Sequence, residues 1–225
     1  KNMSIRKIRL ENGYFYHIFN RSVAKIPIFV SKNDYLRAMN LLRYYRFKNC
    51  PLPYSLFKVM SNNRKEDAFK NLIAKQKELI KIVSFCLMPN HFHFLLKQIM
   101  DNGVSSFMSK FQNSYAKYFN KKYNRPGSLF QNPFKSVLIE DNNQLLHLSR
   151  YIHLNPYSSL IVKKKKDILE YPWSSISQYL GKASSFCQPE EIVDQFKSKK
   201  DYEKFILNRA DYQKTLEEIK HLTYD

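Results

Sequence analysis

The stretch that decides the fold is IVSFCLMPNHFHFLL, residues 82–96. Its first six residues form a mainly apolar run that includes β-branched side chains, which is typical of a strand. Met88, Pro89 and Asn90 interrupt the run, and bulky apolar residues resume directly after His91. The segment therefore predicts two strands, over residues 82–87 and 91–96, joined by a tight turn.

Helical and extended patterns alternate on both sides of this strand pair. Apolar residues recur at helical spacing after Ser31, Val104 and Asp141, and Ser31 and Asp141 are residues that commonly cap a helix. The expected order is a strand at 13–22, a helix at 31–45, an extended run at 54–60, a lysine-rich helix to about residue 81, the strand pair, a helix at 104–124, a strand at 134–140 and a helix from 141 that ends at Asn155-Pro156.

Beyond residue 160 the pattern weakens to four lysines at 163–166, a turn at 171–175 and one or two polar helices after Pro189. No low-complexity linker precedes this region. We therefore expect one α+β domain over residues 1–160 and a basic, helical C-terminal extension over residues 161–225 that packs on it.

The composition points to a polyanionic partner. The 225 residues include 38 Lys and Arg against 19 Asp and Glu, a formal charge of +19. Binding to phosphates releases counterions, and the 33 Tyr and Phe side chains (16 and 17) offer faces for bases, although most aromatic residues belong to protein cores. Four glycines leave little for a phosphate-binding loop. The three cysteines do not have the spacing of a metal or redox site, which predicts reduced thiols. We recognise no membrane span or signal peptide and therefore expect a cytoplasmic protein.

The sharpest local feature is the pair His91 and His93 on the second predicted strand. Alternation places both imidazoles on one face and Phe92 and Phe94 on the other. Two imidazoles on a rigid strand form half of a divalent metal site. The alternative is a pair of half-exposed strand histidines.

A second feature is Tyr151 and Asn155 near the end of the last predicted helix of the domain. A spacing of four residues gives them a common face, which His147 shares one turn earlier. Together they offer a nucleophilic phenol and an oxygen ligand. The alternative is a buried tyrosine and an asparagine that closes the helix before Pro156.

Four separated segments together resemble the single-tyrosine HUH transposases, in particular the REP-associated tyrosine transposase branch. They are FCLMPNHFHFLL (85–96), YAKYFN (115–120), RPGSLFQ (125–131) and YIHLNP (151–156). FNRS at 19–22, IF at 28–29 and WSS at 173–175 also fit this branch, so the resemblance covers about residues 13–180.

The resemblance implies a ferredoxin-like antiparallel sheet with helices on it, the HUH nuclease fold. It also implies one Mg²⁺ or Mn²⁺ ion held against the scissile phosphate of single-stranded or hairpin DNA. Carried over, His91 and His93 are metal ligands, Tyr151 is the nucleophile and Asn155 is the third ligand. A phenol with a pKa near 10 attacks poorly at neutral pH, so an adjacent cation is needed. The implied activity is transposase-like DNA nicking and joining through a 5′-phosphotyrosine.

Basic residues around these motifs are the expected DNA contacts, with a solvated lysine face as the alternative. The candidates are Arg21, Lys110, Lys117, Lys121, Lys122, Arg125, Lys135, Arg150, Lys163, Lys164, Lys165 and Lys166. Two features depart from the branch. Pro133 stands where a basic residue is usual, and residues 52–81 are long for the link between the first helix and the histidine strands, as an insertion would be.

Two other functions stay open at this point: a domesticated protein that holds DNA hairpins without cutting them, and an RNA-binding module. We expect no membrane partner and a nucleoid-associated location when the protein is bound to DNA. The sequence leaves open the target, the cleavage position, the choice between monomer and homodimer, and which of the two metals is used.

Overall fold

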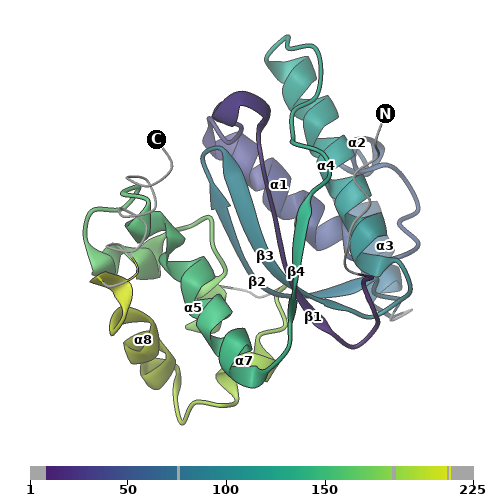
Figure 1. Cartoon of the computed structure of the whole chain (residues 1–225). Helices are drawn as coiled ribbons and strands as arrows, with labels where there is room; N and C mark the ends of the chain where they lie inside the picture. The colour runs from purple at the N-terminus through teal and green to yellow at the C-terminus, as the bar shows by residue number, and fades with distance from the viewer. Residues whose placement is uncertain (1–8, 75–76, 184–185, 212, 214–225) are drawn as a thin grey trace.

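The computed structural model describes residues 9–74, 77–183, 186–211 and 213. Its centre is a four-stranded sheet in the order β2-β3-β1-β4, with every neighbouring pair antiparallel (Figure 1). The strands are β1 (Phe15–Arg21), β2 (Ile80–Met88), β3 (His91–Gln98) and β4 (Lys135–Ile139). This order, with helices between β1 and β2 and a helix between β3 and β4, confirms the predicted ferredoxin-like α+β fold.

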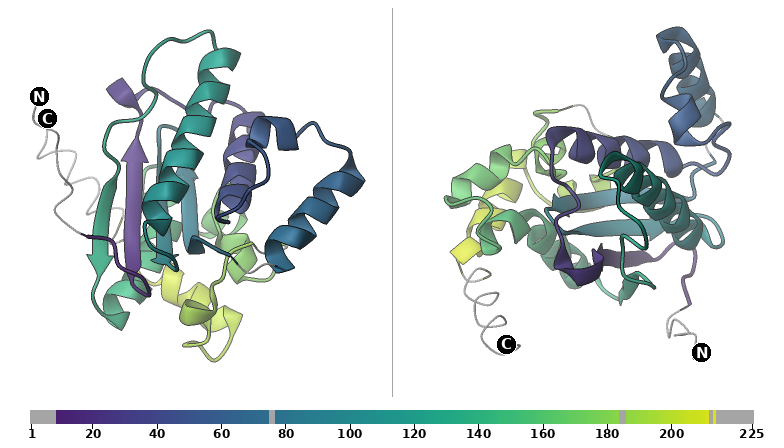
Figure 2. Two further views of the ribbon diagram at one scale, coloured as in Figure 1. Left: turned by 90° about the vertical axis from the view of Figure 1, so that its right-hand side faces the viewer. Right: turned by 90° about the horizontal axis from the view of Figure 1, so that it is seen from above.

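Helices cover both faces of the sheet (Figure 2). The crossover helices α1 (Lys32–Tyr45) and α4 (Gly103–Lys122) pack on one face, and α5 (Asn142–Ser158) packs on the other. The remaining elements are η1 (Val23–Lys25), α2 (Tyr54–Phe57), α3 (Asn62–Ala74), η2 (Lys165–Glu170), α6 (Ile176–Tyr179), α7 (Glu190–Val193) and α8 (Lys199–Leu207). Among the described residues, none of the helices combines the length and apolarity of a membrane span.

The alternation along β3 follows the prediction and separates two cores. Phe92 and Phe94 are fully buried against α1 and α4, and their rings stack with centroids 4.4 Å apart. His91 and His93 face the side that α5 covers, where Leu95 belongs to a second apolar cluster. One strand therefore contributes packing to one face and polar chemistry to the other.

The start of α1 is fastened to the end of α4. Asp34 is fully buried and accepts hydrogen bonds from the backbone N–H of Ser31 (2.8 Å), from Nζ of Lys122 (2.7 Å) and from the hydroxyls of Tyr118 and Tyr123 (2.8 Å each). Burial alone would raise the pKa of this carboxyl, but the hydrogen bonds, that of Lys122 first, outweigh burial and lower the pKa to about 2.

The C-terminal residues pack against β2 and α5. The backbone N–H of Ser175 donates to the carbonyl of Phe85 (3.0 Å). The imidazole of His153 on α5 is fully buried between Oη of Tyr202 (2.9 Å) and Oγ of Ser175 (2.7 Å). These contacts attach α6 and α8 to the helix that carries Tyr151.

Three expectations about local structure are wrong. The lysine-rich helix expected to about residue 81 is α3, which ends at Ala74, because Ile80 and Lys81 already pair with β3 as part of β2. Residues 54–57 form α2 rather than a strand. Pro53 precedes this helical turn, and its carbonyl accepts hydrogen bonds from the N–H groups of Leu56 and Phe57. The helix α5 does not end at Asn155-Pro156 but continues to Ser158. Proline lacks a donor, yet the N–H of Ser159 still reaches the carbonyl of Asn155 (2.9 Å), so the last turn forms.

Candidate active site

A pocket of about 890 Å³ opens between α5 and the end of the sheet where β2 turns into β3. Its walls come from β1, the β2–β3 turn, the start of β4 and α5. The four predicted chemical residues all line it, together with basic and polar neighbours: His91, His93, Tyr151, Asn155, Arg21, Asn90 and Lys135. The fold thus brings together motifs that lie far apart in the chain.

Asn90 determines where the proton of His91 sits. Nδ2 of Asn90 donates to the carbonyl of Lys25 (3.1 Å), which turns Oδ1 toward His91. This Oδ1 lies 2.6 Å from Nδ1 of His91. An amide oxygen can only accept, so Nδ1 of His91 carries the proton. The lone pair is then on Nε2, where a neutral imidazole binds a metal ion.

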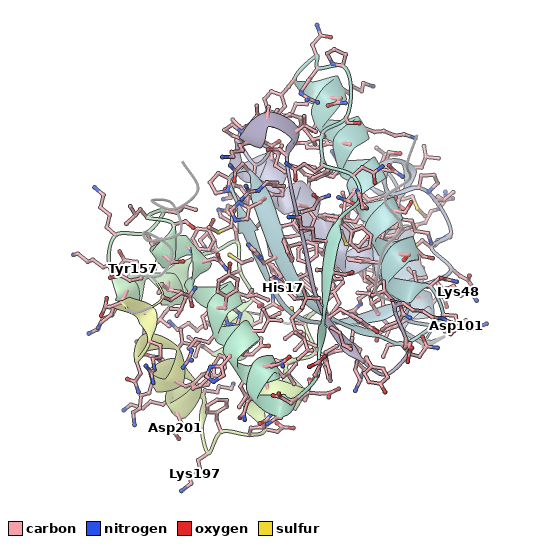
Figure 3. The ribbon with its side chains drawn as sticks, in the orientation of Figure 1. His17, Lys48, Asp101, Tyr157, Lys197 and Asp201 are labelled. Carbon is pink, nitrogen blue, oxygen red and sulfur yellow. The ribbon has the colours of Figure 1, made fainter. Side chains whose placement is uncertain are left out.

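His17 on β1 is a third histidine at this place, and the sequence analysis did not select it. Its Nε2 lies 2.9 Å from Nδ1 of His93, and the two rings stack with centroids 5.2 Å apart. Figure 3 shows His17 between the sheet and α5. If His93 donates from Nδ1 to His17, its Nε2 also keeps a lone pair. The available signal was alternation, which puts His17 on the same face of β1 as Phe19, the residue that pairs with His93.

α5 places Tyr151 beside these histidines. The Tyr151 ring meets His93 and His17 edge-on, with centroids 5.6 Å and 6.1 Å away. Asn155 lines the same pocket one turn later, and its Nδ2 donates to the carbonyl of Tyr151 (2.9 Å). That bond uses the amide nitrogen, so the Oδ1 atom is the one that can accept from a donor or bind a cation.

His147 was expected on this face of α5 but lies away from the pocket. Its Nδ1 is 2.5 Å from a guanidinium nitrogen of Arg150, and its ring lies 6.3 Å from that of Phe205 on α8. One further helical turn carries the side chain beyond the end of the pocket and onto the C-terminal helix.

Burial keeps the imidazoles of the pocket neutral. It lowers the pKa of His17 from 6.5 to about 4, and it lowers that of His91 to about 4 with a smaller contribution from the charge of Arg21. Burial, with the neighbouring histidines and Arg21, also lowers the pKa of His93 well below 6.5. At neutral pH these rings therefore offer lone pairs, while Arg21 and Lys135 give the pocket a positive rim.

The donor set fits a divalent cation. His91 and His93 have ring centroids 5.1 Å apart, each has its Nδ1 in a hydrogen bond, and Asn155 adds an amide oxygen. In the part of the chain that the structure describes, no group of three or more His, Cys, Asp or Glu side chains is placed to hold a metal ion. Two imidazoles alone leave a cation short of ligands, so an ion held here would also need an oxygen donor such as Oδ1 of Asn155.

Two other motif tyrosines, Tyr115 and Tyr118, lie on the opposite side of the sheet. The hydroxyl of Tyr115 donates to the carbonyl of Ile28 (2.5 Å), and that of Tyr118 donates to Asp34 (2.8 Å). Burial raises the pKa of both phenols. As expected from the apolar stripe of α4, these residues have structural partners and do not line the Tyr151 pocket.

The model of the family "Transposase IS200 like" matches residues 54–155, a region that contains His91, His93, Tyr151 and Asn155. This matched region is similar to the IS200-like transposase family. Its fold is similar to the structure of a REP-associated tyrosine transposase bound to a REP hairpin, with a TM-score of 0.55, 13% identity, and coverage of 83% of this chain and 94% of the other.

A crystal structure of a proposed transposase from Deinococcus radiodurans is also similar, with a TM-score of 0.34, 15% identity, and coverage of 68% of this chain and 95% of that one. No curated protein sequence matches the chain.

The predicted DNA contacts do not form one track on the structure. Arg21 and Lys135 line the Tyr151 pocket. Arg125 donates to the carbonyl of Ser128 (2.9 Å) in the loop before β4. The guanidinium of Arg150 covers the Phe205 ring at 4.4 Å.

The other predicted contacts fall in two further places. Lys163, Lys164, Lys165 and Lys166 follow α5, where Lys165 pairs with Asp211 (3.2 Å). Lys110, Lys117, Lys121 and Lys122 lie on α4, on the other side of the sheet, and line a separate groove.

Proposed function

We propose that this protein is a transposase-like, metal-dependent endonuclease and strand transferase that acts on single-stranded or hairpin DNA. The attacking group is the phenol of Tyr151. The observation that carries the proposal is the shared pocket, in which Tyr151 lies edge-on to His93 beneath a rim that includes Arg21 and Lys135.

The proposed reaction exchanges one phosphodiester for another. Oη of Tyr151 attacks phosphorus, the bond from phosphorus to the 3′ oxygen breaks, and a 5′-phosphotyrosine forms. The phenol loses one proton and the leaving 3′ oxygen gains one, so neither a redox partner nor ATP is required. Attack by another 3′-hydroxyl then joins the strands and restores the phenol.

The chain's own residues orient the reactants. Asn90 and His17 hold the Nδ1 sides of His91 and His93, which directs both Nε2 atoms away from those bonds. The residues that would hold Mg²⁺ or Mn²⁺ are His91, His93 and Asn155. When bound, the ion supplies positive charge that favours the phenolate and stabilises the charge developing on the phosphate.

A DNA hairpin is the substrate that we propose. The structural neighbour with the same fold is bound to a REP hairpin, and the net charge of +19 suits a nucleic acid. On these grounds we place the chain in the REP-associated branch and propose that it works on DNA in the cytoplasm.

The test is a covalent adduct. Labelled hairpin DNA with a single-stranded flank is incubated with the protein and Mn²⁺ or Mg²⁺ and resolved on a denaturing gel. We expect an adduct that peptide mapping locates to Tyr151, and none with Tyr151→Phe, which should keep its melting temperature and hairpin affinity.

Adduct on Tyr115 or Tyr118 would contradict this assignment. Tight hairpin binding with no adduct under either metal would favour a protein that only holds hairpins. Tighter binding of the matching RNA hairpin would favour the RNA-binding alternative.

A further inference from the structure

A second hollow, of about 800 Å³, lies on the side of the sheet opposite the Tyr151 pocket, between α1, α2 and α4. We name it the α2–α4 groove. Its basic lining residues are Arg37, Lys58, Lys110, Lys117, Lys121 and Lys122. No carboxylate is among the described residues that line it. Figure 2 shows α4 in front of the sheet, with α1 and the α2–α3 segment beside it.

Most of these cations have no acidic partner. Within the described part of the chain, Lys58, Lys117 and Lys121 form no ion pair, and Lys110 reaches only the carbonyl of Lys48 (3.2 Å). Lys122 differs, because it is bound to the buried Asp34. The groove therefore keeps a field of unneutralised positive charge, which attracts a polyanion.

Arg37 gives the groove a built component. Its guanidinium lies 4.5 Å from the ring centroid of Tyr54 and 5.2 Å from that of Tyr118, which holds it in place. Its Nε is buried and has no hydrogen-bond partner among the described residues. The two rings therefore hold one permanent positive charge in the wall of the groove.

The spacing along α4 favours a polymer over a compact anion. Lys110, Ser114, Lys117 and Lys121 follow one another at steps of four, three and four residues, so they lie on one face of the helix. At a rise of about 1.5 Å per residue they extend over roughly 16 Å. Donors spread over such a length cannot converge on one phosphate, but they can follow a chain of them.

The remaining lining includes side chains with flat or apolar surfaces. Tyr118 contributes a half-buried ring, and Val59, two residues after the end of α2, is 76% exposed. Rings and apolar groups beside a basic track are what unpaired bases use when a single strand binds without sequence preference. Duplex DNA would present only its backbone to this wall.

We propose that the α2–α4 groove binds a single-stranded flank of the DNA substrate, outside the catalytic pocket. The proposal rests on the proposed DNA substrate but does not depend on cleavage. It gives a role to residues 52–81, which supply α2 and Lys58 and lie between α1 and β2.

The experiment compares two charge-reversal pairs by fluorescence anisotropy. The test variant, Lys117→Glu/Lys121→Glu, reverses two charges in the groove. The control variant, Lys197→Glu/Lys200→Glu, reverses two charges at exposed positions, one just before α8 and one in its first turn. Figure 3 shows Lys197 far from α4. The probes are one DNA hairpin without flanks, the same hairpin with single-stranded flanks of increasing length, and an RNA version of the longest.

We expect Lys117→Glu/Lys121→Glu to weaken binding of the flanked hairpin by about 25-fold at 0.1 M salt. The slope of log affinity against log salt concentration should fall by about 1.4, because each of the two lost phosphate contacts accounts for a slope of about 0.7. The hairpin without flanks should lose little, and the α8 pair should change neither probe selectively.

Equal affinity of the wild type and the groove pair for every flank length would overturn the proposal, as would an equal loss on the flankless hairpin. A selective effect on the RNA version alone would assign the groove to RNA instead. Adduct formation at Tyr151 is measured in the same samples. The proposal for the groove can therefore be contradicted while the proposal for the nuclease holds, and the nuclease proposal can be contradicted while the groove proposal holds.

Discussion

The two faces of the sheet are built from the same strands and differ in what they hold. Toward α1 and α4, the strands present fully buried apolar side chains such as Ile18, Phe92 and Phe94. Toward α5, the alternate positions present His17, His91 and His93, which are neutral at pH 7. Both faces carry an apolar core, but only the α5 face combines its core, to which Leu95 belongs, with a group of neutral histidines at the end of the sheet where β2 turns into β3.

The largest effect expected is on the α5 face. His91→Ala or His93→Ala should reduce hairpin cleavage to background while the protein stays folded and bound to DNA, because in the proposed mechanism the histidines hold the metal and basic residues hold the phosphates. Cleavage assays and anisotropy measure the two properties. His147→Ala, on the same side but outside the pocket, is the matched control and should cut normally. If either pocket variant cleaved DNA at the wild-type rate, His91 and His93 would have a structural role and not a catalytic one.

The opposite face should respond in the opposite way. Phe94→Ala removes a fully buried ring and should lower the free energy of unfolding by about 3–5 kcal/mol. Urea titration measures the loss, and Val137→Ala, at a half-exposed position of β4, should cost below about 0.5 kcal/mol. If the Phe94→Ala protein failed to cleave DNA at a temperature where it is fully folded, the assignment of stability to one face and cleavage to the other would be wrong.

The residues behind the histidines should have smaller effects. Asn90→Ala and His17→Ala should each weaken Mn²⁺ binding by about 10–100-fold, because the ring they support is no longer oriented. Electron paramagnetic resonance of free Mn²⁺ measures this without any turnover. Asn90→Asp and His17→Gln keep an acceptor and should recover most of the affinity. A purely structural role would lower the melting temperature and leave Mn²⁺ affinity unchanged.

The smallest expected effect is on how the free energy of unfolding of the metal-free protein depends on pH, which differs between the two faces. His17 has a pKa lowered to about 4 in the folded state, so the unfolded chain binds its proton first and stability falls as the pH drops from about 6.5 toward 4. Asp34 on the other face has a pKa lowered to about 2, so the stability it contributes is present above about pH 3.8 and is lost between there and about 2.

Each fully shifted group changes stability by at most about 1.4 kcal/mol per pH unit within its window. In thermal melts at graded pH, His17→Phe should reduce the slope in the upper window without abolishing it, because His91, His93 and His153 also have lowered pKa values. Asp34→Asn should flatten the lower window. A variant that flattened the other window would show that these groups are not the ones titrating.

Local patterns predicted the parts of the site that lie within one element. The alternation in β3 placed His91 and His93 on one face, and the four-residue spacing in α5 placed Tyr151 with Asn155; the structure brings these four residues into one pocket. Their chemical roles stay predictions. Local patterns did not reveal His17, because its contact with His93 depends on the register between β1 and β3.

The errors also have physical causes. Residues 54–57 contain aromatic and aliphatic residues that suit a strand, but Pro53 favours the first turn of a helix. The lysines of α4 are close in sequence to the motifs, yet α4 and α5 cover opposite faces, so these lysines lie away from Tyr151. Sequence distance gave no information on which face each helix would cover.

The central position of β1 has a consequence for how the chain is made. β1 is the earliest strand in the chain, and both of its neighbours come much later: Arg21 pairs with His91 and Phe15 with Ile139. At about 5–20 residues per second, synthesis reaches β3 roughly 3.5–14 s after β1 and β4 roughly 6–24 s after it. Through that interval the N–H and C=O groups of β1 have no partners from the sheet, as on an open edge strand. Nascent chains that stall before residue 135 therefore expose a template for aggregation, and the Tyr151 pocket cannot be complete until both β4 and α5 have been made.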